Sequence, residues 1–495
     1  MTERYIVVLD EGTTSTRAIL YTAAGHVVAS HSLALDQHYP EPGRVEHDAT
    51  QIWERTLACA RTVIERAGGA DRIAAIGITN QRETVVAWDR RSGQPIHPAI
   101  VWQDRRTADF GETLRAAGHE TEVQRRTGLL LDPYFSGAKM RWIIDHVPEA
   151  KALGDNLALG TIESWLVWNL TSGGAGGGLH ISDASNASRT LLFPLIGDSW
   201  DAGLADLIGV PLAALPDVTD THGQFGHTHP DLFGAAIPIC GLVGDQQSAT
   251  IGQGCLSPGE TKATFGTGAF ILTNMGQSVP ASTNRLLGTV LWQAGGERHY
   301  ALEGSVFVAG SLIQWLRDGL GLLAASADSE ALARSVADSG GVTLVPALTG
   351  LGAPHWQPQA RGSISGLTLG STRAHIVRAA LESMAHQCHD LMQAFAADGA
   401  GWDRLRIDGG MSANDWMAQD LADILNLPVE RPTDVETTAL GAAMCAAVGA
   451  GIYPSLAEAS ARMRPDTAAF GPTMADATRA ARLTAWQDAL AKVMG

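Results

Sequence analysis

Hydroxyl side chains gather in a turn between two apolar runs near the start of the chain, in the stretch IVVLDEGTTSTRAIL of residues 6–20. The first run ends in Asp10, four successive hydroxyl residues occupy positions 13–16, and Arg17 leads into the second run. Backbone N–H groups of a glycine-containing turn can converge on an anion, to which hydroxyl groups add donors and an arginine adds a cation. This combination suits phosphate oxygens, and Asp10 is compatible with them if Mg²⁺ lies between. The alternative is an ordinary hairpin with polar turn residues.

Two further glycine turns occur in the second part of the chain, in FGTGAF around Gly266 and in IDGGMSAND around Gly410. The first turn can approach the same phosphates from the other half of the chain, and the paired glycines of the second turn let a ligand lie flat against the backbone. The alternatives are a bulged hairpin at the first turn and, at the second, a strand–helix joint in which Ser412 and Asn414 cap the helix.

A single acid, Asp245, stands in the stretch VGDQQSA, where it is a candidate general base or metal partner, or alternatively a helix cap. Arg82 and Glu83 adjoin at the end of an expected strand, and Trp102 ends a short apolar run. Two charges and an indole can clasp a small polyol, because the charges bind hydroxyl groups and the ring covers carbon. The alternative is a surface ion pair with a core tryptophan.

The elements that position these residues follow from the apolar periodicity. Strands are expected over residues 5–10, 17–22 and 26–30, followed by a helix that Asp48 caps, and by two strands on either side of the polar break in IAAIGITNQRETVVAWD. The stretch ETKATFGTGAFILTN repeats the strand, glycine turn and strand of the N-terminus. We therefore predict two halves with related cores and a cleft between them, with the passage between halves at residues 240–256.

Helices are expected elsewhere in both halves, and one glycine-rich stretch, TSGGAGGGLH, is expected to be a surface loop. LRIDGGMSANDWMAQDLADIL predicts a strand, a turn and a helix, and the Ala- and Gly-rich residues 438–453 predict a buried helix. The other expected helices cover residues 137–147, 304–320 and 375–397.

The composition bounds the class of protein. The 495 residues are 45% hydrophobic and 18% charged, which predicts a soluble globular protein of two or three domains. The net charge of −17 argues against non-specific binding to nucleic acid or to an anionic membrane. Five scattered cysteines without a C-x-x-C pair suggest neither a disulfide scaffold nor a zinc site. The pattern of the N-terminal residues is typical of a strand rather than of a signal peptide. A cytoplasmic location is therefore expected.

The motifs in order resemble those of the FGGY carbohydrate kinases, nearly from end to end. The matching segments are Asp10 to Arg17, Asn80 to Thr84, Trp102 to Arg106, Asp132 to Lys139, Asn186 to Thr190, Gly244 to Gln247, Phe265 to Gly268, Gly350 to Pro354 and Asp408 to Gly410. Each segment is weak evidence alone, whereas nine in the same order are specific.

This resemblance implies an α/β fold of two actin-like (ribonuclease H-like) domains with an interdomain cleft. Residues 1–250 would bind polyol and phosphate, and residues 251–495 would bind nucleotide. The implied activity is transfer of the γ-phosphoryl group of ATP, with Mg²⁺, to the terminal hydroxyl of glycerol. Such relatives form homodimers or homotetramers, and neither nucleic acid nor membrane insertion is implied.

The resemblance also implies roles for individual residues. Asp245 would act as the base, Asp10 would organise Mg²⁺ together with Asp245, and Arg17 would stabilise the transferred phosphoryl group. The implied polyol contacts are Arg82, Glu83, Trp102, Tyr134, Asp245, Gln246 and Phe270. The implied nucleotide contacts are Thr13, Thr14, Ser15, Arg17, Gly266, Thr267, Gly310, Gln314, Gly410 and Asn414.

Two positions depart from the family pattern. Glu11 replaces a usual glutamine and would add an anion beside phosphate unless it faces away or meets the metal, and Asp104 replaces a frequent cysteine close to Trp102. Two other functions stay open. A pentulose or sugar-acid kinase of the same family would need a different polyol pocket, and an actin-like nucleotide switch would need neither Asp10 nor Asp245.

Overall fold

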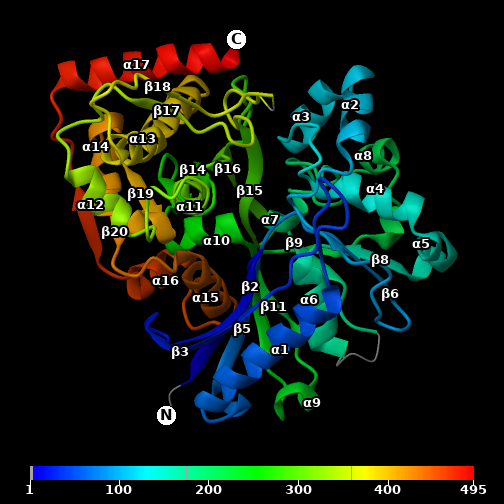
Figure 1. The fold of residues 1–495 in the computed structure, drawn as a ribbon. Coiled ribbons are helices and arrows are strands. Elements are labelled where there is room, and N and C mark those ends of the chain that lie inside the picture. The colour runs from blue at the N-terminus through cyan, green and yellow to red at the C-terminus, as the bar shows by residue number, and fades with distance from the viewer. Residues whose placement is uncertain (1–3, 173–176, 358) are drawn as a thin grey trace.

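The first half of the chain is built on a six-stranded sheet with the strand order β11-β12-β5-β1-β2-β3. The structure is a computed structural model that describes residues 4–172, 177–357 and 359–495. β1, β2 and β3 form an antiparallel meander, and β5 and β12 lie parallel to β1 (Figure 1). The strands are β1 (Tyr5–Glu11), β2 (Ser15–Tyr21), β3 (Val27–Ala34), β5 (Ile73–Asn80), β11 (His222–His227) and β12 (Pro238–Gly244).

Helix α1 (Ala49–Arg66) covers one face of this sheet. Asp48 caps it as predicted, because its carboxylate accepts hydrogen bonds from the backbone N–H groups of Thr50 and Gln51. Ile52 and Ile64 point into the core with the strands. The predicted strand, turn, strand and capped helix of the N-terminus are therefore confirmed.

The second half is built on a seven-stranded sheet with the order β15-β16-β14-β13-β19-β20-β21. β13 pairs antiparallel with β14 and parallel with β19, which repeats the pairing of β1 with β2 and β5. The predicted relation between the two cores is thus present in the sheets. The strands are β13 (Thr261–Phe265), β14 (Ala269–Gly276), β15 (Leu287–Ala294), β16 (Glu297–Val306), β19 (Leu405–Asp408), β20 (Val429–Pro432) and β21 (Thr467–Phe470).

The helices of the second half follow the sequence prediction with one correction. A strand–turn–helix ends in α14 (Asp415–Leu425), and α13 (Arg373–Ala397) is the long helix expected there. The helix expected over residues 304–320 begins only at Gly310, as α11 (Gly310–Asp318), because residues 297–306 are strand β16. β16 pairs on both sides with β14 and β15, and this tertiary pairing decides its conformation.

Two helices, α10 (Asp245–Gly252) and α15 (Thr437–Gly449), pack against each other between the halves (Figure 1). A Cβ atom on Gly441 would lie 1.9 Å from the backbone oxygen of Ser248, so only glycine permits this approach. α15 also packs on β1, β5 and β12, and its alanine-rich surface joins the buried core beneath the first sheet. The predicted buried helix is confirmed, and the boundary at residue 250 falls inside α10 and stays a prediction.

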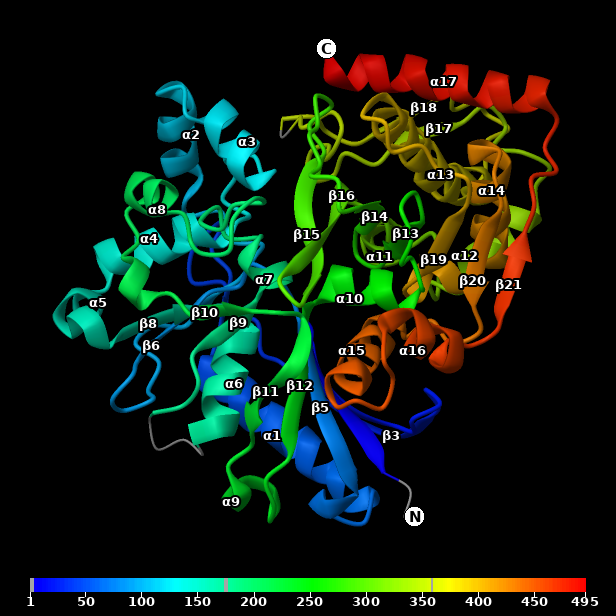
Figure 2. The same ribbon diagram turned by 180° about the vertical axis from the view of Figure 1, so that it is seen from behind.

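The remaining part of the first half lies beside β15 (Figure 2). Ser188 and Thr289 join their hydroxyl groups at 3.0 Å across this contact. Its helices are α2 (Ala108–Ala116), α3 (Glu120–Thr127), α4 (Ser136–His146), α5 (Pro148–Leu153), α7 (Ala184–Ala187) and α8 (Ala202–Ile208), whereas α6 (Ile162–Ser172) packs with α1 on the first sheet. Of the predicted glycine-rich loop, residues 173–176 lie outside the described residues.

All five cysteines are buried and free. In the described part of the chain, no helix combines the length and apolar character needed to cross a bilayer.

Candidate active site

The carboxyl ends of three parallel strands bring the first group of candidate residues to one edge of the first sheet. Asp10 on β1 lies opposite Thr79 on β5, and Val243 on β12 lies opposite Thr79 from the other side. Arg82 and Asp245 follow these strand ends directly, so residues far apart in sequence share one edge. Crevices at such edges are the usual ligand sites of open α/β sheets.

Arg17 lies opposite Asp10 in the β1–β2 hairpin and binds two carboxylates. Its Nη2 is 2.5 Å from Oδ2 of Asp10, and its Nη1 is 2.7 Å from Oε2 of Glu436, just before α15. Burial would lower the pKa of the guanidinium, but Asp10 and Glu436 raise it above its ordinary value. Arg17 therefore remains a cation at the point where the two halves meet.

Glu11 faces away from Asp10, because successive side chains of a strand point to opposite faces. It is fully buried against α1, where the Thr56 hydroxyl donates to its Oε2 at 2.9 Å. Its Oε1 contacts no hydrogen-bond partner among the described residues. Burial raises the pKa of Glu11 to about 8, so at neutral pH the side chain is uncharged and adds no anion at the cleft.

The hydroxyl turn is connected to the aromatic residues of the site. The backbone N–H of Gly12 donates to the carbonyl of Ser15 at 3.0 Å and closes the turn. The indole N–H of Trp102 donates to Oγ1 of Thr13 at 2.9 Å. The candidate phosphate turn and the candidate polyol residues are therefore in direct contact.

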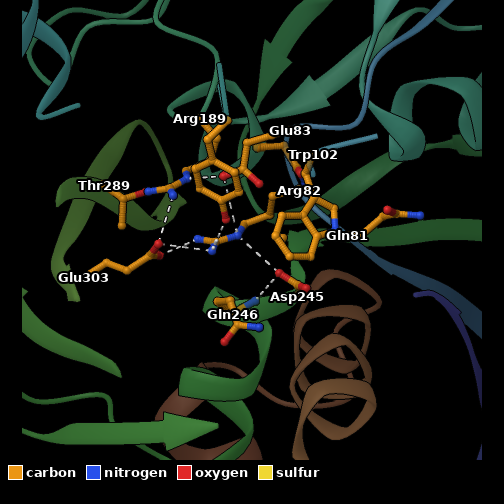
Figure 3. A network of polar contacts seen from close by, with 12 residues as sticks. Gln81, Arg82, Glu83, Trp102, Arg189, Asp245, Gln246, Thr289 and Glu303 are labelled. Carbon is orange, nitrogen blue, oxygen red and sulfur yellow. Dashed lines mark hydrogen bonds and ion pairs between the residues drawn. The ribbon is translucent and has the colours of Figure 1, made fainter. Parts of the chain in front are cut away.

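Arg82 and Glu83 form part of a buried ion-pair network (Figure 3), so the alternative of a surface pair is wrong. The guanidinium of Arg82 lies 2.6 Å from Glu303 and 3.2 Å from Asp245, whereas Glu83 is 3.9 Å away and binds Arg189 at 2.6 Å. Glu83 adopts a φ of 64°, a left-handed backbone that costs a non-glycine residue about 1–3 kcal/mol. Such strain is typical of functional sites.

Three aromatic rings from separate elements meet beside this network. The Trp102 ring lies 5.7 Å from Tyr134 and 6.4 Å from Phe270, both in edge-on arrangements. Phe270 belongs to β14 of the second half, so both halves supply the aromatic wall. All three rings remain partly exposed, which leaves apolar surface for a ligand.

Asp245 is the first residue of α10, and its carboxylate accepts the N–H of Gln246 at 2.7 Å. The N-cap position is Gly244, so the helix-cap alternative is wrong. The side chain is 30% exposed. Burial raises the pKa of Asp245 to about 6, while Arg82 opposes this rise. A carboxylate with this pKa is ionised at neutral pH and is well matched to accept a proton.

The glycine turns of the second half come together at the carboxyl end of β13. The N–H of Gly310 donates to the carbonyl of Gly266 at 2.9 Å, and that of Ser311 donates to Thr267 at 3.1 Å. A Cβ atom on Gly310 would lie 2.5 Å from the Gly266 oxygen and 3.1 Å from Met411, so these turns touch. Gly266 and Thr267 are exposed at their edge.

Two other predicted nucleotide residues lie on the helices that start at these turns. Gln314 is exposed on α11. Asn414 caps α14 by accepting the N–H of Met417 at 2.9 Å, which agrees with its predicted capping role. Ser412 instead donates to the carbonyl of Gly409 at 2.7 Å, so it closes the turn and does not cap the helix.

Sequence reasoning missed three charged residues of the site. Glu303 and Arg189 are fully buried in the network of Figure 3, and Lys262 donates to the side-chain oxygen of Gln246 at 2.6 Å. Burial lowers the pKa of Lys262 to about 8. For Glu303 and Lys262 a lone charge inside an apolar strand was the available signal, since a buried ion needs a partner, whereas Arg189 lies in the matched segment Asn186 to Thr190. Asp104, in contrast, supports the backbone by accepting the N–H of Val45 at 2.7 Å and pairing with Arg106.

The two carboxylates predicted to hold a metal are each paired with an arginine, Asp10 with Arg17 at 2.5 Å and Asp245 with Arg82 at 3.2 Å. In residues 4–172, 177–357 and 359–495, no group of three or more His, Cys, Asp or Glu side chains could hold an ion by itself. Mg²⁺ commonly binds through one or two carboxylates and completes its shell with phosphates and water. The donor set therefore fits Mg²⁺ only together with a phosphate ligand.

Comparison with known proteins identifies the family of this chain and several similar proteins. The models for the N-terminal and C-terminal domains of the FGGY family of carbohydrate kinases match residues 5–252 and 261–450. The glycerol kinase of Rhodospirillum centenum is 53% identical, with 98% of this chain and 97% of that protein covered. The one from Rhodospirillum rubrum is 50% identical, with 99% of each covered.

Solved structures agree with the sequence comparisons. The crystal structure of Plasmodium falciparum glycerol kinase with ADP has a TM-score of 0.92 and 34% identity, over 100% of this chain and 99% of that one. A xylulose kinase from Rhodospirillum rubrum has a TM-score of 0.86 and 26% identity, over 99% of each chain.

Proposed function

The chain belongs to the FGGY family of carbohydrate kinases, and from that premise we propose that the site phosphorylates glycerol with ATP to give sn-glycerol 3-phosphate and ADP. Relatives named as glycerol kinases share about half of their residues with this chain over nearly the whole length. The α/β fold in two actin-like halves, predicted from the motifs, is confirmed.

The observation that carries the proposal is the partly exposed carboxylate of Asp245, which lies 3.2 Å from the Arg82 guanidinium. Asp245 accepts the proton of the terminal hydroxyl as that oxygen attacks phosphorus. Arg82, Glu83 and Gln246 orient the hydroxyl groups, and the rings of Trp102, Tyr134 and Phe270 cover the carbon chain. Base catalysis of this kind contributes about 100- to 10,000-fold to the rate.

The phosphate side of the cleft is formed by the turn of Thr13, Thr14 and Ser15 and by Arg17. Arg17 already binds the carboxylates of Asp10 and Glu436, so an incoming phosphate competes with Glu436 for its guanidinium. The turns at Gly266, Thr267, Gly310 and Gly410, with Gln314 and Asn414, contact the nucleotide from the second half. Phosphoryl transfer needs this positioning and charge neutralisation more than covalent chemistry.

Asp10 and Asp245 would hold Mg²⁺ together with a phosphate ligand, and the bound ion would supply neutralisation of charge on the phosphate oxygens. Closure of the halves around both substrates excludes water, which otherwise competes with the alcohol as acceptor.

We further propose that the protein forms a homodimer or homotetramer and is located in the cytoplasm. Light scattering measures the oligomeric state.

A substrate panel with the purified protein tests the function. ATP consumption is coupled to an indicator reaction with glycerol, xylulose, gluconate and other small polyols as acceptors. We expect the largest kcat/KM with glycerol. A larger value with xylulose or gluconate would assign the site to sugar kinases, and ATP turnover that is independent of every acceptor would favour an actin-like nucleotide switch.

A further inference from the structure

One buried carboxylate of the second half holds two arginines of the first. Glu303 lies on strand β16, which pairs with β14 and β15, and is fully buried. Its Oε2 lies 2.6 Å from Nη1 of Arg82, and its Oε1 accepts from Nη2 of Arg189 at 2.9 Å and from Nη2 of Arg82 at 3.3 Å (Figure 3). The two side chains of the first half are thus anchored to the other sheet.

The network contains two positively and two negatively charged side chains. Arg82 and Arg189 face Glu83 and Glu303, and all four side chains are buried. A buried ion pair contributes little net stability, because desolvation offsets the attraction. Such a network is therefore better explained by the orientation that it imposes on its members than by the stability it adds.

The donors of Arg82 show which orientation is imposed. Nε faces Asp245 at 3.2 Å, and Nη1 serves both Glu303 and Gln247. Nη2 has only the 3.3 Å contact with Glu303 and a long 3.5 Å contact with the hydroxyl of Tyr134. The Nη2 edge of the guanidinium thus faces Tyr134, a residue that the proposed function assigns to the acceptor alcohol.

Glu303 also competes with Asp245 for the same cation. Without the Glu303 charge, Arg82 is free to turn its fork toward Asp245 or Glu83, which lie 3.2 and 3.9 Å from its Nε. A two-point pair with Asp245 would occupy the carboxylate that receives the proton. Glu303 therefore holds the guanidinium of Arg82 away from a two-point pair with Asp245, whose contacts with Arg82 and Gln246 both fall on Oδ1.

We propose that Glu303 is a positioning residue for the acceptor alcohol, which acts through Arg82 and makes the polyol pocket of the first half depend on a carboxylate of the second. The inference rests on the proposed function, since it assigns Arg82 and Asp245 to the acceptor. Gln247 supports the arrangement by donating to Thr289 of β15 at 3.1 Å, which holds the start of α10 against the same sheet.

Steady-state kinetics of the full-length Glu303→Gln variant test this role. Glutamine keeps the shape and one acceptor but removes the charge. We expect the KM for glycerol to rise about 10- to 100-fold, because small misplacement of a binding group costs rates and affinity of this size. The KM for ATP should stay within about twofold, since the nucleotide turns do not contact Glu303, and kcat should fall as Arg82 turns to Asp245.

Glu382→Gln is the matched control. Glu382 is also a buried glutamate of the second half between two arginines, 3.1 Å from Arg378 and 3.9 Å from Arg482, and it lies on α13 away from the site residues. A merely structural loss should affect both variants alike, lowering kcat and Tm without a selective change in the KM for glycerol.

The outcomes separate the inference from the proposed function. A folded Glu303→Gln variant with unchanged KM for glycerol, or with equal changes in both KM values, would overturn the role of Glu303. If the Glu303→Gln variant does not fold, Glu303→Asp is the second test, because aspartate keeps the charge on a shorter side chain. We expect a selective but smaller rise of the KM for glycerol in this variant. An unchanged KM for glycerol would overturn the role of Glu303 in the same way. A parent protein without glycerol turnover would instead contradict the proposed function.

Discussion

The Nε atom of Arg82 lies 3.2 Å from Oδ1 of Asp245, so the cation proposed to orient the acceptor is also the nearest countercharge of the proposed base. Binding and proton transfer are coupled through this one contact. Arg82 lowers the pKa of Asp245 and burial raises it, and the balance leaves it at about 6.

Asp245→Asn removes the base without changing the size of the side chain. We expect kcat to fall by about 100- to 10,000-fold, while glycerol binding remains measurable by calorimetry. Asp36→Asn, a substitution on the exposed surface, serves as the control and should keep its activity. Near-normal turnover of Asp245→Asn would remove Asp245 from the role of base.

The pH dependence of kcat/KM reports the same carboxylate in the free protein. Only the ionised form accepts a proton, so the rate should be lost as pH falls through about 6, by about tenfold for each further unit. A pH–rate profile between pH 4.5 and 9 measures this limb. An acidic limb near pH 4, the ordinary value of an aspartate, would contradict the influence of burial.

Glu11→Gln tests the buried acid beneath the hydroxyl turn. The native pKa of about 8 lies above the unfolded value of 4.5, so the native state holds a proton that the unfolded state releases. Stability is therefore lost as pH rises from 4.5 to about 8, by up to about 1.4 kcal/mol per unit. Glutamine removes this loss. The Tm of the variant should exceed that of the parent protein slightly at pH 5 and strongly at pH 8. Its activity at pH 7 should be near normal. A gain in Tm that does not depend on pH would mean that Glu11 is not protonated.

Phe270→Ala tests the wall that the second half adds to the polyol pocket. Loss of the ring contact with Trp102 should lower kcat/KM for glycerol about tenfold or more and leave the KM for ATP unchanged. Phe225→Ala, which removes a half-buried ring on β11, is the matched control. Equal effects of the two substitutions would indicate general destabilisation rather than a pocket contact.

Asp10→Asn tests the metal site. We expect turnover to depend on Mg²⁺ and to stop when a chelator removes it. In the variant, the Mg²⁺ concentration for half-maximal rate should rise, since one of two carboxylates is lost. Titration of Mg²⁺ at fixed ATP measures the shift, and an unchanged midpoint would show that Asp10 has no part in metal binding.

Local structure could be predicted from the sequence because its signals lie within a few residues. The turn at 12–15 sets the register of the β1–β2 hairpin, which places Arg17 opposite Asp10, and Asp48 marks the start of α1. Because successive side chains of a strand point to opposite faces, the sequence also predicts that Asp10 and Glu11 face opposite ways. That Glu11 is buried, however, follows only from the packing of α1.

The ordered motifs determined the family, the chemistry and the candidate residues, but not how these residues pair. Arg82 and Glu303 are 221 positions apart, and no local pattern records that they meet. Whether an adjacent Arg82 and Glu83 form a surface pair or a buried network depends on which strand the other half brings against them. Only the tertiary structure decides this, because the energy of a buried charge is set by partners that distant segments supply.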